Sequence, residues 1–513
     1  MNERLSSSLA NLPDYLGQHV LLSASALLLA LAVSLPLAIA AARSPALRGP
    51  IIGIASLVQT IPGLALMALF YPLLLALSML LEPALGWKLP ALGFLPALMA
   101  LTLYALLPVL RNAVAGIEGI DPAVKQAALA VGMTRSQLLW QVEAPLAAPV
   151  IMAGIRTAAV WTIGAATLAT PVGQTSLGNY IFSGLQTENW VSVLFGCAIS
   201  AALALSVDAL LGCVEAGIRQ RRRTLVFGSL AILCAGIAVA LAPLMVRGSA
   251  QQRIVIGAKN FSEQFILADL VASHLEKAGF NTQQKQGLGS AIAFRALAGN
   301  EIDVYVDYSG TLWTNVLQRG DMPSRAIMHR ELTAQLRERF GVAVLGQLGF
   351  ENAYALVMKE ERAKALNITS IDDVASQART MTFGTDLEFL ERPEWKELRE
   401  SYGLQFQSTR TFAPTFMYRA LAGGEADVIT GFSSDGRIAA ENLRVLEDRK
   451  GAIPAYDALI LVSPRRAGDA RFMDALKPLI GSIKVEAMRA ANYAVDRDAD
   501  KLTPAQAAAI LAR

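Results

Sequence analysis

The sequence predicts two parts of different fold class, an α-helical membrane domain followed by an α/β domain of two lobes. Three observations support this. Residues 1–250 hold the long apolar runs and carry only 13 of the 45 basic and 9 of the 42 acidic side chains. The second half alternates short apolar strands with polar helices, and it contains an internal repeat. A chain of 513 residues is also too long for a single core.

Six apolar segments are long enough to cross a bilayer core of ~30 Å at about 1.5 Å per helical residue. They lie at residues 20–42, 51–81, 92–110, 150–169, 190–213 and 225–246. The second segment exceeds one straight span, and Pro62 and Pro72 allow it to bend or to split off a re-entrant piece. We count it as one crossing.

Basic residues set the orientation of these spans. Arg43, Arg48 and the cluster Arg219–Arg223 fall on one side, together with the basic residues between the third and fourth spans. That side is therefore predicted to be cytoplasmic, and everything after the sixth span is predicted to lie outside. Two charges fall within spans, Arg156 and Asp208; a functional role and a packing or snorkelling contact are both open.

A polar segment, Gln126–Pro145, separates the third and fourth spans and has the character of a docking loop. Alanines leave a low helix surface, a glycine ends the helix, and a proline sets where the next helix begins. The residues in this pattern are Gln126, Ala127, Ala128, Gly132, Val142 and Pro145. Their spacing resembles the cytoplasmic coupling loop of ABC-importer membrane subunits, from which Gln126 (for Glu) and Ala144 (for Leu) depart.

Flanking sequences narrow that resemblance to permeases for betaine, choline and related quaternary amines: "LYALLPVLRNAVAGIEGIDP", "GIRTAAVWTIGAATLAT" and "LGNYIFSGL". The resemblance implies a type I ABC-importer fold in a bacterial cytoplasmic (inner) membrane, with cytoplasmic ABC ATPase subunits as partners. It also implies a homodimer, because a single five-span core is half of a pathway. The sequence has no G-x-x-x-x-G-K-[ST] motif, so we expect ATP hydrolysis in a separate subunit and no enzymatic activity in this chain.

The internal repeat lies in the second half, where "FRALAGNEIDVYVDYSG" from Phe294 matches "YRALAGGEADVITGFSSDG" from Tyr418 at an offset of 124 residues. The strand "IVIGAKN" likewise resembles "MTFGTDL" around Gly384. Each unit is a helix, a glycine turn and an apolar strand that ends in polar and aromatic groups. Ligands of open α/β sheets bind at such strand ends, so two facing lobes predict one cleft.

The second half resembles an extracytoplasmic substrate-binding protein of the glycine betaine, carnitine and choline family. The resemblance is carried by "GAKNFSEQ", "DYSGT", "GFSSDGRI" and "IPAYDA". It implies the following domains: a permease at 1–223, a sixth span and linker at 224–251, and a binding domain at 252–513. Within the last, lobe one is 252–350 with 459–513, and lobe two is 351–458.

A quaternary ammonium group has no N–H to donate, so aromatic ring faces are what hold it. The resemblance places such a cage at Tyr308, Tyr354, Phe432 and Tyr456, with Phe432 where a tyrosine is expected. Tyr308 and Phe432 also occupy matching places in the repeat. Carboxylate anchors carried over from the family are Lys259, Thr311 and Arg392. Each aromatic has packing in the core as an alternative, and Arg392 has pairing with Glu388 or Glu391 on the surface.

We therefore predict an ATP-driven importer subunit for quaternary ammonium compounds, and glycine betaine or a related osmoprotectant is the first candidate ligand. Choline, carnitine and ergothioneine remain alternatives. A ligand-binding membrane receptor or sensor is a different class, but it would need a cytoplasmic signalling domain or pore filter. The three cysteines lie in apolar runs and the three histidines are scattered, so no disulfide, metal site or cofactor is predicted. The net charge of the second half is close to zero, which argues against nucleic acid as a binding partner.

Overall fold

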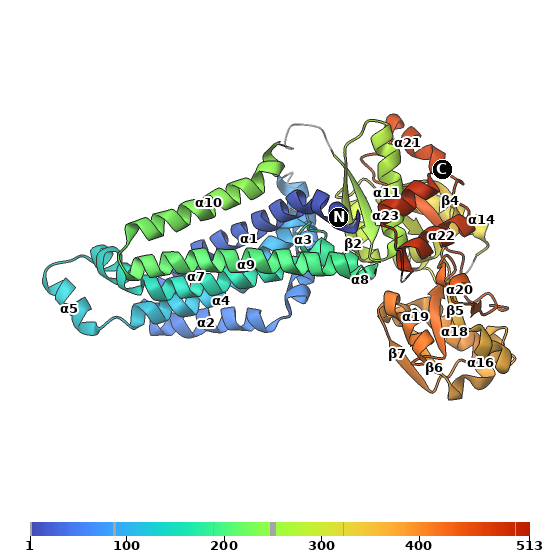
Figure 1. Cartoon of the computed structure of the whole chain (residues 1–513), viewed down its shortest axis with the longest axis horizontal. Coiled ribbons are helices and arrows are strands. Elements are labelled where there is room, and N and C mark those ends of the chain that lie inside the picture. The colour runs from blue at the N-terminus through green and yellow to red at the C-terminus, as the bar shows by residue number, and fades with distance from the viewer. Residues whose placement is uncertain are drawn as a thin grey trace. The chain divides into compact units, whose positions relative to one another are not determined.

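The computed structural model describes residues 3–85, 89–187, 189–246, 253–321, 323–497 and 499–512 (Figure 1). The chain divides into two compact units, residues 1–182 with 190–250, and residues 183–189 with 251–513. The helices of the membrane part fill the first unit, and the second holds all of the described strands. The predicted domain limit at residues 251 and 252 lies outside the described residues.

The first unit is a helical bundle. Six of its described helical segments are long and apolar enough to cross a membrane, at residues 11–43, 63–81, 94–118, 135–172, 190–219 and 223–243. This confirms the predicted helical membrane domain. Its α-helices are α1 (Glu3–Arg43), α2 (Pro45–Thr60), α3 (Gly63–Leu85), α4 (Phe94–Glu118), α5 (Pro122–Ala130), α6 (Arg135–Gln137), α7 (Ala144–Ala166), α8 (Gly178–Gln186), α9 (Trp190–Arg219) and α10 (Arg223–Val246).

The long apolar segment at residues 51–81 is broken. Helix α2 ends at Thr60, Ile61 is extended, and α3 begins at Gly63 directly after Pro62. Proline has no N–H to donate and disfavours a helical conformation in the residue before it, which explains the position of the break. With 16 residues, α2 is about 24 Å long and shorter than the bilayer core. The single crossing counted from the sequence is α3, and Pro72 lies inside that helix.

Small residues set how closely the central helices pack. A Cβ on Gly154 of α7 would lie 2.7 Å from the Pro108 carbonyl oxygen of α4. On Gly116 of α4, a Cβ would lie 3.3 Å from the Cβ of Ala147. Such small residues let helix backbones approach closely in a membrane, where van der Waals packing replaces the hydrophobic effect. The helix that follows the docking loop is therefore held tightly against α4.

The two charges predicted within spans pair with each other. The Arg156 guanidinium of α7 donates Nε and Nη2 to the two carboxylate oxygens of Asp208 in α9, at 3.0 and 2.9 Å, and Nη1 to Glu215 at 2.8 Å. Gly212 lies between the two acids and makes room for the guanidinium, which is 3.3 Å from the position of its missing Cβ. This geometry favours a packing contact between α7 and α9.

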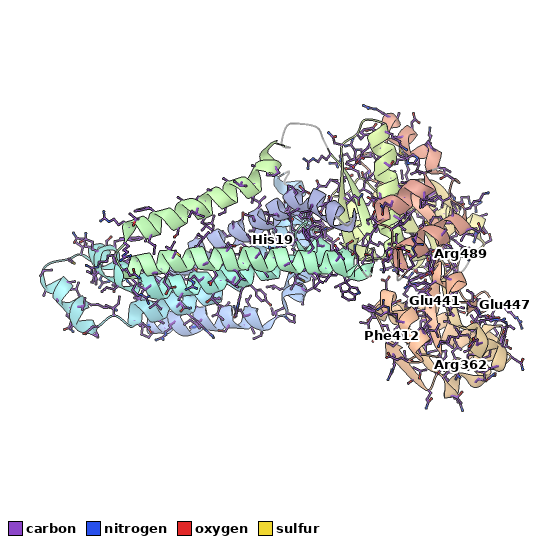
Figure 2. The ribbon with its side chains drawn as sticks, viewed as in Figure 1. His19, Arg362, Phe412, Glu441, Glu447 and Arg489 are labelled. Carbon is purple, nitrogen blue, oxygen red and sulfur yellow. The ribbon has the colours of Figure 1, made fainter. Side chains whose placement is uncertain are left out.

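His19, labelled in Figure 2, is fully buried in the same unit.

The second unit contains two five-stranded sheets of the same build, with strand orders β2-β1-β3-β10-β4 and β7-β6-β8-β5-β9. In both sheets two parallel pairings are followed by two antiparallel ones. The strands are β1 (Ile254–Lys259), β2 (Thr282–Leu288), β3 (Val304–Tyr308), β4 (Ala343–Glu351), β5 (Tyr354–Lys359), β6 (Thr382–Thr385), β7 (Ser408–Thr411), β8 (Val428–Phe432), β9 (Leu443–Val445) and β10 (Asp457–Val462).

The internal repeat corresponds to equivalent positions in the two sheets. Its strands are β3 and β8, each the central strand of its sheet and each parallel to the strand of the "IVIGAKN" or "MTFGTDL" segment. Even a side-chain contact is repeated. Asp303 Oδ2 accepts from the Val255 amide at 2.8 Å, and Asp427 Oδ2 accepts from the Thr382 amide at 2.9 Å. The predicted two-lobed α/β fold is therefore confirmed.

Helices cover both sheets (Figure 1). On the first, α11 buries Phe265, Ile266 and Leu270 against β1 and β3, and the C-terminal helices pack on α11. The helices of this unit are α11 (Ser262–Lys277), α12 (Ser290–Ala298), α13 (Ser309–Thr311), α14 (Arg325–Phe340), α15 (Glu360–Ala365), α16 (Ile371–Gln377), α17 (Leu387–Glu391), α18 (Pro393–Tyr402), α19 (Pro414–Gly423), α20 (Arg437–Ala440), α21 (Ala470–Leu476), α22 (Val485–Asp496) and α23 (Pro504–Leu511).

Candidate ligand-binding cleft and coupling loop

A cleft of about 430 Å³ lies where strand ends of the two sheets meet. Its volume is in the range of small-molecule sites, roughly 300–1,000 Å³. All seven ligand residues predicted from the sequence line it: Lys259, Tyr308, Thr311, Tyr354, Arg392, Phe432 and Tyr456. The structure therefore brings together residues that are up to 197 positions apart in the chain, from both sheets.

The rings of this cleft form a connected set. Tyr354 lies 5.0 Å from Phe432 and 5.8 Å from Tyr456 between ring centroids, and its ring is nearly perpendicular to that of Tyr456, at 86°. A fifth ring joins them: Phe261 is 6.2 Å from Phe432 and 6.3 Å from Tyr308. Several ring faces around one volume are the arrangement that attracts an organic cation.

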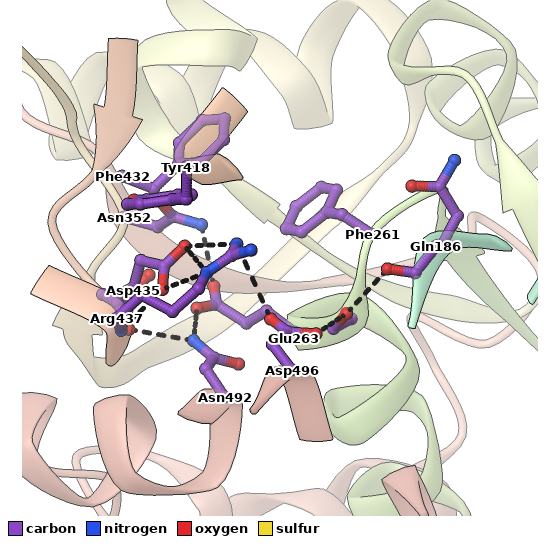
Figure 3. Close-up of a pocket in the computed structure, with 12 residues that line it drawn as sticks. Gln186, Phe261, Glu263, Asn352, Tyr418, Phe432, Asp435, Arg437, Asn492 and Asp496 are labelled. Carbon is purple, nitrogen blue, oxygen red and sulfur yellow. Dashed lines mark hydrogen bonds and ion pairs between the residues drawn. The ribbon is translucent and has the colours of Figure 1, made fainter. Parts of the chain in front are cut away.

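Tyr308 is held in place by a buried carboxylate. Its hydroxyl donates to Glu263 Oε1 at 2.5 Å. Asn352 and Asn492 donate to the two oxygens of the same carboxylate at 3.0 and 2.7 Å (Figure 3). Burial raises the pKa of Glu263, and these hydrogen bonds oppose the rise. Burial and the Glu263 charge raise the pKa of Tyr308 well above its ordinary value, so its hydroxyl stays a donor.

Tyr456 is fixed from the other side. Its hydroxyl donates to Glu394 and accepts from Arg392 Nη2 at 3.0 Å. The ring lies against the backbone of Gly310, where a Cβ would come within 2.6 Å of the ring carbon Cζ. Only glycine leaves that space, which explains the glycine of the "DYSGT" motif.

The predicted coupling loop has a defined local structure. Asp121 caps α5 by accepting from the Ala123 amide at 2.8 Å, with Pro122 as the first helical residue. Gly132 then adopts a left-handed φ of +85°, where glycine is favoured. Thr134 and Gln137 form a capping box that starts the second short helix. The chain thus turns sharply between two helices, as the small-residue spacing predicts.

Most of the predicted coupling residues lie at the surface of this loop. Gln126, Ala127, Gly132 and Pro145 are exposed, Val142 is half-buried, and Ala128 is buried. The same loop has three exposed apolar side chains, with exposed fractions of 76% for Val131, 69% for Trp140 and 49% for Leu129. Glu143 lies beneath, 3.6 Å from Arg43 and 3.9 Å from Lys125.

Residues 252–511 match the family described as the substrate-binding domain of the ABC-type glycine betaine transport system. Residues 34–220 match the inner membrane component of binding-protein-dependent transport systems. The chain belongs to both families. It is a permease domain fused to a binding domain, it lies in the inner membrane, and permeases of this kind work with an ATPase subunit.

Relatives share one or both domains. The chain is 27% identical over 466 residues to an ergothioneine transport permease/ergothioneine binding protein of Helicobacter pylori, across 88% of this chain and 81% of that protein. It is 40% identical to a carnitine transport permease protein of Listeria monocytogenes, over 39% of this chain and 84% of that one. A glycine-betaine-binding protein of Pseudomonas aeruginosa is 31% identical, over 55% of this chain and 92% of that protein.

The anchors of the binding domain differ from the prediction in one respect. The alternative for Arg392 was pairing with Glu388 or Glu391 on the surface, and its location is wrong, because the side chain lies in the cleft and the residue is only 5% exposed. It nevertheless pairs with acids, Glu388 at 2.9 Å and Glu394 at 3.2 Å. Lys259 is likewise paired with the buried Asp307. The two cations are therefore balanced before any ligand arrives, because burying them alone would be far more costly.

Sequence reasoning missed several residues that line the cleft. They include Phe261, Asn352, Asp386 and Phe412, the last labelled in Figure 2. Phe261 lies inside the "GAKNFSEQ" motif, so its signal was present as an aromatic beside Lys259. The sequence also contained a signal for Asp386, because the repeat that aligns Gly257 with Gly384 aligns Lys259 with Asp386. Phe412 and Asn352 follow no pattern that the sequence alone shows.

A second, smaller cavity lies beside Phe261 and Phe432 and is lined by polar groups (Figure 3). Arg437 pairs with Asp435 at 2.7 Å and lies 4.0 Å from Asp496, which accepts from the Ser262 hydroxyl at 2.5 Å. Burial raises the pKa of Asp496 to about 6, and the charge of Arg437 opposes the rise. The segment after β8 is thus tied to both α11 and α22.

This environment predicts a pH-dependent contribution to stability. The folded pKa of Asp496 is above its unfolded value, so the folded state binds more protons between pH ~4 and ~6. Stability from this group is present below that window and is lost as pH rises through it, by up to about 3 kcal/mol. Calorimetric scans measure the melting temperatures of Asp496→Asn and of the unsubstituted chain, and the difference between them should shift in favour of Asp496→Asn as pH rises from 4 to 6.5. The exposed Asp474→Asn is the control, and equal pH profiles for all three would contradict the assignment.

Proposed function

We propose that this chain imports small zwitterionic quaternary ammonium compounds, driven by a separate cytoplasmic ATPase. The observation that carries the proposal is the convergence of six aromatic rings, five of them in mutual contact, and two basic side chains in one cleft of a domain fused to a permease. The rings suit a trimethylammonium group. Arg392, whose Nε–H has no partner among the described residues, suits a carboxylate. Glycine betaine, carnitine and ergothioneine have both groups, whereas choline lacks the carboxylate.

We further propose that two copies of the chain form one translocation pathway on two ATPase subunits. The support is the exposed apolar surface of the coupling loop, Leu129, Val131 and Trp140, next to the exposed Gln126 and Gly132. Contiguous apolar groups at a surface mark interaction sites. The binding domain is fused to the same chain, so each pathway would carry two receptors at high effective concentration.

Calorimetric titration of the full chain in detergent with matched amines tests the ligand class. We expect glycine betaine, carnitine or ergothioneine to bind, dimethylglycine to bind more weakly, and glycine to give no measurable heat. The reason is that each lost methyl group removes apolar contact with the rings and adds an N–H that the rings cannot accept well. Equal affinity for glycine and the trimethylated compounds would refute the cage, and a folded protein that binds none of them would refute the proposed function.

A further inference from the structure

Asp386 is the feature of the cleft that the function proposed above leaves unexplained. It lines the cleft, it is 7% exposed, and its Oδ2 atom has no hydrogen-bond partner among the residues that the structure describes. Arg392 Nε and Asn352 Oδ1 are the other unpartnered polar atoms of described residues that line the cleft, and of the two acceptors only Asp386 Oδ2 belongs to a carboxylate. Glu394 Oε2 also lacks a partner, but Glu394 does not line the cleft. A buried polar atom without a partner is costly, so its presence calls for an explanation.

The orientation of this carboxylate is fixed by the fold. Its Oδ1 atom accepts from the Phe389 amide at 2.8 Å and caps the short helix α17, which leaves Oδ2 as the free oxygen. The preceding residue, Thr385, is held by the Thr430 hydroxyl at 2.9 Å. Burial raises the pKa of Asp386, while the Phe389 amide and the charge of Arg392 oppose the rise. The acid is therefore positioned rather than free to turn toward solvent.

The internal repeat relates Asp386 to Lys259 of the first lobe. Lys259 ends β1 and Asp386 directly follows β6, at equivalent places of the two sheets. Lys259 is satisfied by Asp307, whereas Asp386 has no cation within ion-pair distance in the described part of the chain. The first lobe thus presents a neutralised pair at its strand end, and the second lobe presents an acceptor.

We propose that Asp386 is a specificity residue of the cleft, whose Oδ2 accepts a hydrogen bond from an N–H or O–H group of the ligand. This inference rests on the proposed function and narrows it. A trimethylammonium group and a carboxylate have no donor, so the ligand is a zwitterionic quaternary ammonium compound with a third, donating group. Carnitine offers a hydroxyl and ergothioneine a ring N–H, whereas glycine betaine offers neither. The ligand that we propose first is therefore no longer glycine betaine, which the sequence favoured, but a compound with such a donor.

Ligands that differ by one donor test this directly. Carnitine and γ-butyrobetaine differ only by the hydroxyl. Ergothioneine and glycine betaine differ by a whole imidazole-thione side chain, so for this pair the informative quantity is the change in their affinity ratio caused by Asp386→Asn. The full chain in detergent is titrated with all four, as purified and as Asp386→Asn. Asparagine keeps an acceptor for the Phe389 amide and is as good a helix cap as aspartate, so the fold is preserved. Asp469→Asn, which changes the equivalent cap of α21, is the matched control.

We expect at least one donor-bearing ligand to bind more tightly than its donor-free partner. Asp386→Asn should reduce that ratio of dissociation constants about tenfold or more, the range of a hydrogen bond to a charged group, and Asp469→Asn should leave it unchanged. If Asp386→Asn lowers all four affinities by one factor, or none, Asp386 is only a helix cap and the inference is overturned. If the unsubstituted chain binds none of the four, the proposed function itself fails.

Discussion

Gly132→Asp is expected to abolish ligand-stimulated ATP hydrolysis in a complex of this chain with its ATPase, while ligand affinity stays unchanged. Gly132 lies in the turn of the coupling loop with a φ of +85°, and no heavy atom lies within 4 Å of the position of its missing Cβ. An aspartate therefore meets no neighbouring atom, although the positive φ strains its backbone, as it does at Gly424, the control position. It places a carboxylate between exposed apolar residues, Val131 and Trp140, where a partner's groove would have to desolvate it.

The expected loss is large because burying an unpaired carboxylate in a docked interface costs several kcal/mol. That is sufficient to reduce occupancy of the docked state by two orders of magnitude or more. Stimulation is measured as the ratio of phosphate release with and without saturating ligand in proteoliposomes. Gly424→Asp is the control, since Gly424 has a φ of +76° and equally open surroundings in the binding domain. Undiminished stimulation in Gly132→Asp would refute the coupling assignment.

The fold was predictable because its signals are local or repeated. Span length follows from apolar runs, and only the break at Pro62 needed the structure to decide between a bend and a split. The equivalence of Tyr308 and Phe432 follows from a repeat of 124 residues, which the two central strands reproduce. A repeat fixes which residues are equivalent, so it predicts which side chains meet at one cleft.

The groups that hold the cleft residues were not predictable in the same way. Glu263 is 45 positions from Tyr308, and Glu394 is 62 positions from Tyr456, with no pattern that links either pair. Such pairs form because a buried hydroxyl or guanidinium needs a partner, and tertiary packing selects which acid is within reach. For the same reason the sequence alone could not show that Lys259 and Arg392 are already paired with acids. Their acids are as much a part of the site as they are.

Removing the ring of Tyr308 or Tyr456 is expected to affect both binding and stability. Both are buried, at 4% and 1% exposed, and both hydroxyls bond to carboxylates. Replacement by alanine should weaken ligand binding by roughly two- to thirty-fold, since a ring face contributes about 0.5–2 kcal/mol to a desolvated cation. It should also lower the free energy of unfolding by about 3–5 kcal/mol, as for other large buried side chains.

Replacement by phenylalanine separates these two effects. In Tyr308→Phe the ring face remains, so affinity should stay within about threefold of the unsubstituted chain. Glu263 loses its shortest hydrogen bond, however, and stability should fall by about 1–3 kcal/mol. Tyr402 provides the matched control: it is 7% exposed and its hydroxyl donates to Asp448 at 2.5 Å, but it does not line the cleft. Tyr402→Ala should lose stability alone. If Tyr308→Ala and Tyr456→Ala behave like Tyr402→Ala, with normal affinity in the folded fraction, the two tyrosines are core residues and the aromatic cage must be abandoned.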